Sequence, residues 1–115
     1  MLNSKEILYK YWGYESFRHN QEEIIDSVLN GKDTIAILPT GGGKSLCFQI
    51  PSLMRDGICI VISPLISLMK DQLTSLKSKN IKSVALTHEM SQKDIEISLD
   101  NCIYGDYKFL YVSPE

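Results

Sequence analysis

The chain has 115 residues, of which 43% are hydrophobic and 23% charged. This composition is typical of one globular domain and excludes disordered and fibrous chains. No stretch approaches the ~20 apolar residues of a membrane-spanning helix, and Lys5 and Glu6 put charge where a signal peptide needs its apolar segment. We therefore expect an intracellular, cytoplasmic protein with no membrane partner. The formal net charge of −2 gives no overall sign of a nucleic-acid partner, which usually leaves a basic footprint.

The cysteines fit a reducing compartment. Cys47, Cys59 and Cys102 are widely spaced, each lies in an apolar stretch, and none forms a C-x-x-C pair. His19 and His88 are isolated from each other and from the thiols. Because a zinc site takes ligands paired at short spacing, we expect three buried free thiols rather than a metal centre.

Two helices are predicted at the start of the chain from apolar residues at three- and four-residue spacing. The first begins after a Ser4 cap and ends at Gly13. The second covers residues 21–30, and Asn20 with Glu23 resembles a capping box at its start.

The remainder of the chain alternates strands and helices. Short apolar runs bounded by turn residues predict strands buried on both faces, at residues 34–38, 58–62, 84–86 and 109–112. Helical patterns lie between them, at residues 44–54, 65–79 and 92–101. This order predicts an α/β fold with a parallel sheet and flanking helices, preceded by the N-terminal helices. We divide the chain into a helical segment, residues 1–31, and a βαβ core, residues 32–115.

Within the helix predicted over residues 65–79, the apolar residues Leu65, Leu68, Met69 and Leu73 are expected to form the core face.

A glycine-rich loop joins the first predicted strand to a helix. It contains Thr40, Gly41, Gly42, Gly43, Lys44 and Ser45. Glycines let successive backbone N–H groups approach phosphate oxygens, and the following helix N-terminus adds positive charge. Lys44 would reach the β- and γ-phosphates, and the Ser45 hydroxyl would bind Mg²⁺. The strict pattern G-x-x-x-x-G-K-[ST] is not met because Leu38 takes the first glycine position. The alternative is a glycine-rich turn followed by a surface lysine.

Four motifs together resemble the RecQ family of DNA helicases, a branch of helicase superfamily 2. The loop at residues 38–45 is similar to motif I, which in that family tolerates the missing glycine. Residues 13–21 (GYESFRHNQ) resemble the motif that precedes it, residues 63–72 (SPLISLMKDQ) motif Ia, and residues 111–115 (YVSPE) motif Ib. The resemblance implies the N-terminal part of the first RecA-like lobe, with ATP and Mg²⁺ as cofactors.

The resemblance also implies a site for the base. Gln21 would hydrogen-bond the adenine edge, while Tyr14 and Arg18 would flank the face of the ring. The family often has glycine where this chain has Asn20. From the residues alone, without the resemblance, we would interpret Tyr14 and Phe17 as core or interface aromatics and Gln21 as a solvated residue at the start of a helix. Lys44 would be the catalytic residue of the loop.

By the same resemblance, motifs Ia and Ib hold the backbone of single-stranded DNA, and the substrate would be duplex DNA with a single-stranded tail. The candidate residues are Ser63, Pro64, Leu65, Ser67, Lys70, Ser113 and Pro114, with Thr87 a further candidate after the third predicted strand. Four lysines between residues 63 and 86, at positions 70, 77, 79 and 82, outnumber Asp71 and give a local charge of +3. We interpret Lys77 and Lys79 as a solvated helix end.

Family members hydrolyse ATP with an Asp-Glu-Ala-His motif, and the 115 residues contain no Asp-Glu pair. The resemblance thus implies a 3′ to 5′ helicase of recombination or repair, of which these residues alone neither hydrolyse ATP appreciably nor unwind DNA. An incomplete sheet leaves an unpaired edge, so we expect association or marginal stability. Two alternatives remain: a phosphotransferase that uses the same loop, and a non-catalytic nucleotide- or DNA-binding module.

Overall fold

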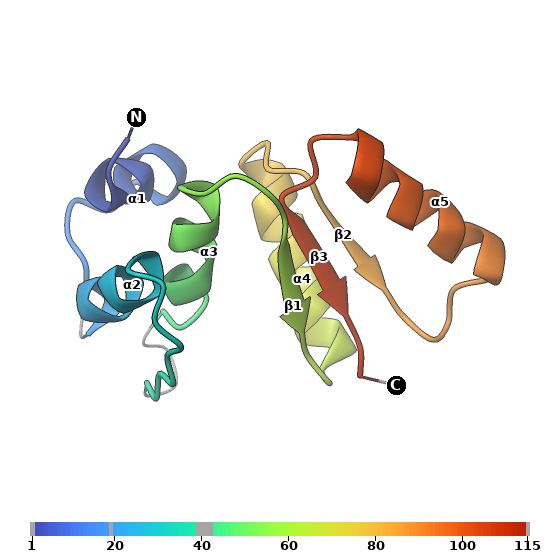
Figure 1. Ribbon diagram of the computed structural model, residues 1–115, viewed down its shortest axis with the longest axis horizontal. Helices are drawn as coiled ribbons and strands as arrows, with labels where there is room; N and C mark the ends of the chain where they lie inside the picture. Colours follow the sequence, from blue (N-terminus) through green and yellow to red (C-terminus); the bar gives the residue numbers. More distant parts are fainter. Residues whose placement is uncertain (1, 19, 39–42, 115) are drawn as a thin grey trace. The chain divides into compact units, whose positions relative to one another are not determined.

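The computed structural model describes residues 2–18, 20–38 and 43–114 (Figure 1). The chain divides into two compact units, residues 1–56 and residues 57–115. The first unit contains the helices α1 (Ser4–Trp12), α2 (Gln21–Leu29) and α3 (Leu46–Leu53). The second contains, in chain order, β1 (Cys59–Ile62), α4 (Ile66–Ser78), β2 (Ser83–Leu86), α5 (Gln92–Tyr104) and β3 (Phe109–Val112).

The core of the first unit lies where its three helices meet. Five buried residues form it: Ile7, Leu8, Ile25, Leu46 and Ile50. Phe17, Trp12 and other half-buried apolar residues pack around this cluster. Each helix contributes its apolar stripe, which is the pattern expected of amphipathic helices packed on one another. The predicted core role of Phe17 is therefore confirmed.

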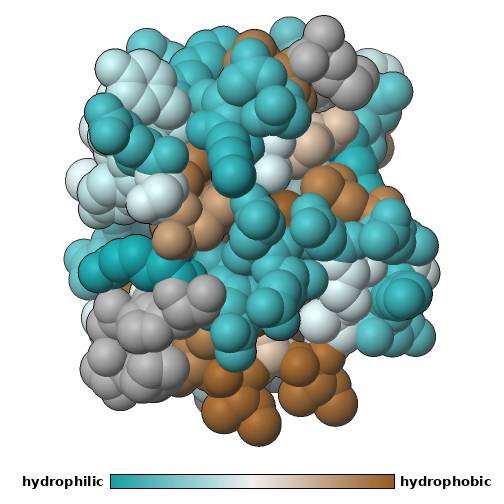
Figure 2. Space-filling view, turned by 90° about the vertical axis from the view of Figure 1, so that its left-hand side faces the viewer, coloured by the Kyte–Doolittle hydropathy of each residue, from teal (hydrophilic) through white to brown (hydrophobic). Residues whose placement is uncertain are grey.

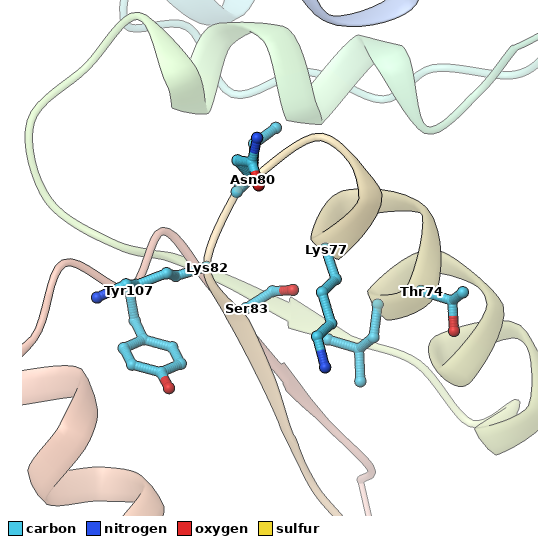
Figure 3. Close-up of a pocket in the computed structure, with 8 residues that line it drawn as sticks. Thr74, Lys77, Asn80, Lys82, Ser83 and Tyr107 are labelled. Atoms are coloured by element: carbon cyan, nitrogen blue, oxygen red, sulfur yellow. The ribbon is translucent and has the colours of Figure 1, made fainter.

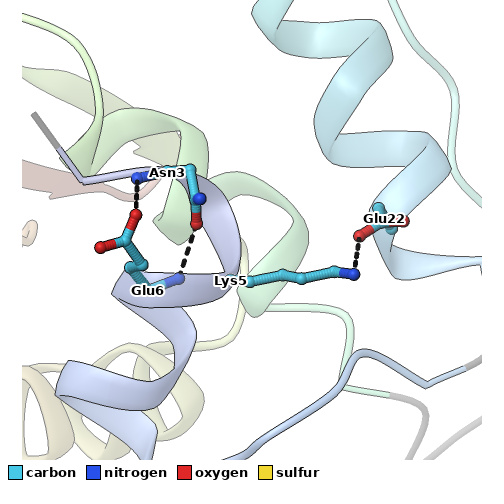
Figure 4. A network of polar contacts seen from close by, with 4 residues as sticks. All are labelled: Asn3, Lys5, Glu6 and Glu22. Atoms are coloured by element: carbon cyan, nitrogen blue, oxygen red, sulfur yellow. Dashed lines mark hydrogen bonds and ion pairs between the residues drawn. The ribbon is translucent and has the colours of Figure 1, made fainter.

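Helix α1 begins one residue earlier than predicted, because Asn3 and not Ser4 is the N-cap. The Asn3 side chain accepts a bond from the Glu6 backbone N–H at 2.9 Å, and the Glu6 carboxylate accepts one from the Asn3 N–H at 3.2 Å (Figure 4). This reciprocal pair is a capping box, which satisfies two backbone donors at once. Gly13 ends the helix in the left-handed conformation, as predicted.

The predicted capping box at the start of α2 is wrong. Asn20 makes no side-chain cap bond. Instead the Gln21 side-chain oxygen accepts a bond from the Arg18 N–H at 2.9 Å, while the Gln21 N–H donates to the Arg18 carbonyl at 3.1 Å. The turn before the helix is thus closed by its first residue, which leaves Asn20 and Glu23 at the surface.

The first predicted strand is also wrong: residues 34–38 are described without regular secondary structure. Ile35 and Ile37 are 92% and 89% exposed, and Figure 2 shows brown, apolar side chains projecting at the lower edge of the face it views. Only Leu38 is buried in this run. A strand needs a partner strand, and the described residues of this unit form helices alone, so apolar character by itself did not produce one.

The second unit is built on a parallel three-stranded sheet of order β1-β3-β2 (Figure 1). Phe109, the first residue of β3, is aligned with Cys59 of β1 and Ser83 of β2, and the register runs without a break to Val112. Helices α4 and α5 connect the strands, which confirms the predicted α/β order for this half of the chain.

Helix α4 packs on the sheet through fewer residues than predicted. Met69 and Leu76 are each 1% exposed, and they share the core with Ile81 and with all of β3 except Val112. Leu73 is half-buried, whereas Leu65 and Leu68 are 58% and 45% exposed, so the predicted core face was wrong at its N-terminal end.

Cys47 is a buried free thiol as predicted, but Cys59 and Cys102 are only half-buried. Among the described residues, no group of three or more His, Cys, Asp or Glu side chains could hold a metal ion. None of the helices in this part of the chain is long and apolar enough to cross a membrane.

Candidate nucleotide and nucleic-acid sites

The C-terminal end of the glycine-rich loop leads directly into α3. Gly43 has φ +72°, Lys44 is exposed, and Ser45 is the half-buried N-cap residue of the helix. This is the loop-to-helix arrangement that presents backbone N–H groups and a lysine to phosphates. The other predicted loop residues, Thr40, Gly41 and Gly42, lie outside the described residues.

Gln21 connects the adenine motif to this loop. Its side-chain Nε2 donates to the Gly43 carbonyl at 3.1 Å, and its Oε1 accepts from the Arg18 N–H at 2.9 Å. The Gly43 carbonyl also accepts from the Leu46 N–H at 3.3 Å. Gln21 is 1% exposed, so its interpretation as a solvated helix start is wrong. A buried amide needs its hydrogen bonds, and both of its polar atoms bind the chain itself.

Gly43 must be glycine for two separate reasons. Its positive φ is a conformation that side chains rarely adopt. A Cβ built on Gly43 would lie 2.2 Å from Nε2 of Gln21, which is inside van der Waals contact. A side chain at this position would therefore have to displace the Gln21 amide.

The two residues expected to flank the base lie at the surface of the same unit. Tyr14 is 52% exposed and Arg18 is exposed. Tyr14 follows Gly13, which ends α1, and Arg18 precedes the turn that Gln21 closes. Both side chains are thus accessible to a ligand, and Phe17 between them faces the core instead.

In the second unit, three predicted DNA-binding residues meet at one edge of the sheet. Ser63, Ser113 and Thr87 each follow the last residue of a strand, β1, β3 and β2 respectively. The Ser63 N–H donates to the Val112 carbonyl at 3.0 Å, and the Ser113 N–H to the Leu86 carbonyl at 3.4 Å. Because the strands are in register and about 4.8 Å apart, the three residues form a row, which we call the strand-end row. Such carboxyl edges are where open α/β sheets bind ligands.

The N-terminus of α4 lies beside the strand-end row. The Ser63 hydroxyl accepts a bond from the Leu65 N–H at 3.2 Å, and Pro64 between them is exposed. Leu65, the N-cap residue, makes no side-chain cap bond, so the first N–H groups of the 13-residue helix are not covered by a cap. A helix N-terminus of this kind attracts phosphate. Ser67 and Lys70 are exposed in the first turns, whereas Pro114 is exposed just after Ser113.

A comparison with family models matches residues 18–115 to the DEAD/DEAH box helicases. The matched span includes the loop, the strand-end row and both sheet helices. The chain belongs to the DEAD/DEAH box helicase family. Its fold is thus part of a RecA-like helicase lobe.

Curated helicases are similar over nearly the whole chain. The probable ATP-dependent DNA helicase RecS of Bacillus subtilis is 47% identical over 116 residues, covering 100% of this chain and 23% of that protein. The ATP-dependent DNA helicase RecQ of Haemophilus influenzae is 47% identical over 109 residues, covering 95% and 18%. A protein of Acanthamoeba polyphaga mimivirus, named as an ATP-dependent RNA helicase, is 48% identical over 111 residues, covering 96% and 20%. The chain therefore spans less than a quarter of these helicases, all three of which are named as ATP-dependent.

One contact inside the helicase fold was missed from sequence. The Tyr111 hydroxyl of β3 donates to Oε1 of Gln72 on α4 at 2.6 Å, and Tyr111 is 1% exposed. Gln72 ends motif Ia and Tyr111 begins motif Ib, so this bond joins the two motifs that flank the strand-end row. The presence of a polar residue at the end of motif Ia and another at the start of motif Ib was a weak signal for this bond. Their separation in the sequence gave no reason to pair them.

Proposed function

We propose that this chain is the N-terminal part of the ATP-binding domain of a RecQ-type DNA helicase, which couples ATP hydrolysis to 3′ to 5′ movement on single-stranded DNA. The observation that carries the proposal is the buried bond from Gln21 to Gly43, because it joins an adenine motif to a phosphate-binding loop. The family assignment and the DNA helicases named above support the choice of partner.

In this proposal the nucleotide binds in the first unit. Lys44 contacts the β- and γ-phosphates, with Thr40, Gly41, Gly42 and Gly43 of the loop around them. Gln21 reads adenine, and Tyr14 and Arg18 flank the ring. The Gln21 amide carries two N–H donors and two acceptor lone pairs, so it could bind adenine in addition to Gly43 and Arg18.

The Ser45 hydroxyl suits a magnesium ion that is bound mainly by phosphates. Mg²⁺ in nucleotide sites keeps several waters and binds substrate phosphates with one or two protein oxygens. Ser45, at the start of α3 and next to Lys44, offers one such oxygen, and the ion would shield phosphate charge there. We propose Ser45 as the protein ligand of a phosphate-bound ion.

DNA binds in the second unit, along the strand-end row and the start of α4. Hydroxyls, uncapped helix N–H groups and Lys70 hold phosphates without reading base sequence. The proposed contacts are Ser63, Pro64, Leu65, Ser67, Lys70, Thr87, Ser113 and Pro114. The substrate would be duplex DNA with a single-stranded tail, and the protein would act in the cytoplasm.

The nucleotide site is tested by the thermal shift of the 115-residue chain with ATP. ATP at one hundred times its Kd stabilises a single site by about 2.7 kcal/mol, and Lys44→Ala should abolish most of that shift. Lys32→Ala removes another exposed lysine of the same unit and should leave it intact. A shift that persists in Lys44→Ala would show that the loop assignment is wrong.

Two alternative functions are separated by nucleic-acid binding. A phosphotransferase has no use for the strand-end row, so it would bind ATP without binding single strands. A non-catalytic module would bind both, and the longer protein would not hydrolyse ATP. Fluorescence anisotropy with DNA and RNA strands of equal sequence tests the partner, and a preference for RNA would overturn the DNA assignment.

A further inference from the structure

A hollow with both polar and apolar lining lies at the opposite end of α4 from the strand-end row (Figure 3). Its volume is about 580 Å³, within the range of small-molecule sites. Eight residues line it: Leu73, Thr74, Lys77, Asn80, Ile81, Lys82, Ser83 and Tyr107. We call it the α4 C-terminal pocket. It includes two of the four lysines that give this segment its positive charge.

The polar lining of this pocket consists mainly of uncommitted donors. Within the described part of the chain, the side chains of Lys77, Asn80 and Ser83 have no hydrogen-bond or ion-pair partner. The Lys82 ammonium stands 5.8 Å from the centre of the Tyr107 ring. Only the Thr74 hydroxyl donates elsewhere, to the Lys70 carbonyl at 3.0 Å. A ligand with negative charge and several acceptor oxygens matches this set.

The charge of the lining has one sign. Lys77 and Lys82 are the only ionisable groups apart from the Tyr107 phenol, and no lining residue is acidic. Figure 3 shows Lys77 and Ser83 projecting into the space between α4 and β2. Of the apolar lining residues, Leu73 is half-buried and Ile81 is 6% exposed. This apolar wall suits the body of a ligand larger than a free phosphate.

The C-terminus of α4 would by itself repel an anion, because the last carbonyls carry partial negative charge. Here those carbonyls are occupied. The Leu76 carbonyl accepts from the Lys79 and Ile81 N–H groups at 3.0 Å each, and the Lys77 carbonyl accepts from the Asn80 N–H at 3.0 Å. With two ammonium groups added, the positive charges outweigh the half charge of the helix end.

The pocket is separate from the strand-end row. Ser83 is the first residue of β2, and Thr87 follows the last, so the two lie about 13 Å apart at ~3.3 Å per residue. Lys70 precedes Lys77 by seven residues, which is about 10 Å along the helix. The positive charge of residues 63–86 is therefore divided between two sites, with Lys70 near the strand-end row and Lys77 and Lys82 at the α4 C-terminal pocket.

We propose that the α4 C-terminal pocket binds a phosphate group carried by a larger ligand. Lys77, Lys82 and Ser83 hold the phosphate, and Leu73, Ile81 and Tyr107 contact the body. Two sources share this chemistry: a nucleotide unit of a nucleic-acid strand and a free nucleotide. The proposal does not depend on the nucleotide loop, because the pocket lies entirely within the second unit.

The test is an NMR titration of the ¹⁵N-labelled 115-residue chain carrying Lys44→Ala, which disables the proposed loop. The probes are inorganic phosphate, AMP, a six-nucleotide thymidine strand and a six-residue glutamate peptide, all at constant ionic strength. We expect the amide signals of Lys77, Asn80, Lys82 and Ser83 to shift with the phosphate-bearing probes. Shifts with the strand alone identify a nucleic-acid ligand, and equal shifts with AMP identify a free nucleotide.

The variant Lys77→Gln/Lys82→Gln should raise the Kd obtained from these titrations about a hundredfold, about tenfold for each charge-assisted hydrogen bond lost. Lys79→Gln is the matched control, since the Lys79 ammonium binds Ser75 on its own helix and does not line the pocket. If Lys77 serves only to stabilise the helix end, the double variant will lower the melting temperature and leave the shifts unchanged. That result, equal shifts with the glutamate peptide, or no shifts at all would overturn the proposal.

Discussion

At the scale of single residues, Gln21 and Gly43 act as one packing unit. The amide of Gln21 fills the space that a Cβ on Gly43 would need, and its Nε2 binds the Gly43 carbonyl. A change at either position is therefore felt at the other. This gives the adenine motif a direct effect on the loop before any ligand binds.

Gly43→Ala should destabilise the first unit by about 2–3 kcal/mol, because it adds a clash with Gln21 to the cost of a positive φ. Gly31→Ala is the matched control: its φ is +77°, but a Cβ there meets nothing within 4 Å. It should cost about 1 kcal/mol. Urea unfolding of both variants measures the difference, and equal losses would show that Gln21 moves aside without cost.

Tyr111→Phe should lower the free energy of unfolding by about 1–1.5 kcal/mol, because it removes the donor to Gln72 without changing the ring that fills the core. Tyr104→Phe, at a side chain that is 86% exposed, should change it by less than about 0.5 kcal/mol. Chemical denaturation compares the two. A neutral Tyr111→Phe would mean that water replaces the bond.

Burial raises the pKa of the Cys47 thiol and of the Cys102 thiol above the ordinary value of 9.0. The folded state therefore holds these protons more tightly than the unfolded state, so this part of the stability is present below pH 9.0 and is lost as the pH rises above it. The variant Cys47→Ala/Cys102→Ala should show a shallower decline of unfolding free energy between pH 8 and pH 10.5. An identical slope in both proteins would contradict a role for the thiols.

At the scale of elements, β1 and β2 are both edge strands of the described sheet, and β1 is the one with exposed apolar side chains. It pairs only with β3, and Ile60 and Ile62 on one of its faces are 61% and 68% exposed. A free strand edge next to apolar side chains favours pairing with another chain. We therefore predict that the association expected from the incomplete sheet involves this strand.

Ile60→Lys/Ile62→Lys should therefore reduce association of the 115-residue chain, since charge on an edge strand opposes pairing. Sedimentation velocity over a tenfold concentration range measures it. Ile97→Lys/Ile103→Lys on α5, where the side chains are 49% and 70% exposed, controls for general effects of charge. Equal effects of both pairs would show that β1 has no special part.

Helices and the last three strands were predictable, because each has a local apolar period and turn residues at its ends. The irregular conformation of residues 34–38 was not predictable, since an apolar run does not show whether a partner strand is available. The burial of Gln21 was missed for a related reason: a glutamine at a helix start is usually solvated, and only the glycine 22 residues later makes room for it. Thr87 joined the strand-end row through register, which sequence does not encode locally.

At the scale of the whole molecule, the proposed nucleotide site and the proposed nucleic-acid site lie in different units. The loop and the adenine motif lie in residues 1–56, and motifs Ia and Ib in residues 57–115. Each unit has a hydrophobic core of its own. Nucleotide and nucleic acid can therefore be studied by variants that leave the other unit's packing untouched.

The geometry of the strand-end row has a further consequence for the proposed binding of DNA. Its spacing comes from backbone bonds of the sheet, Ser63 to Val112 and Ser113 to Leu86, and not from the side chains that face the ligand. The distance between neighbouring members of the row is thus fixed at about 4.8 Å by the sheet. Replacing one hydroxyl would leave the spacing of the row unchanged. The phosphates of a bound strand would then keep their positions, while the contact with one of them weakens.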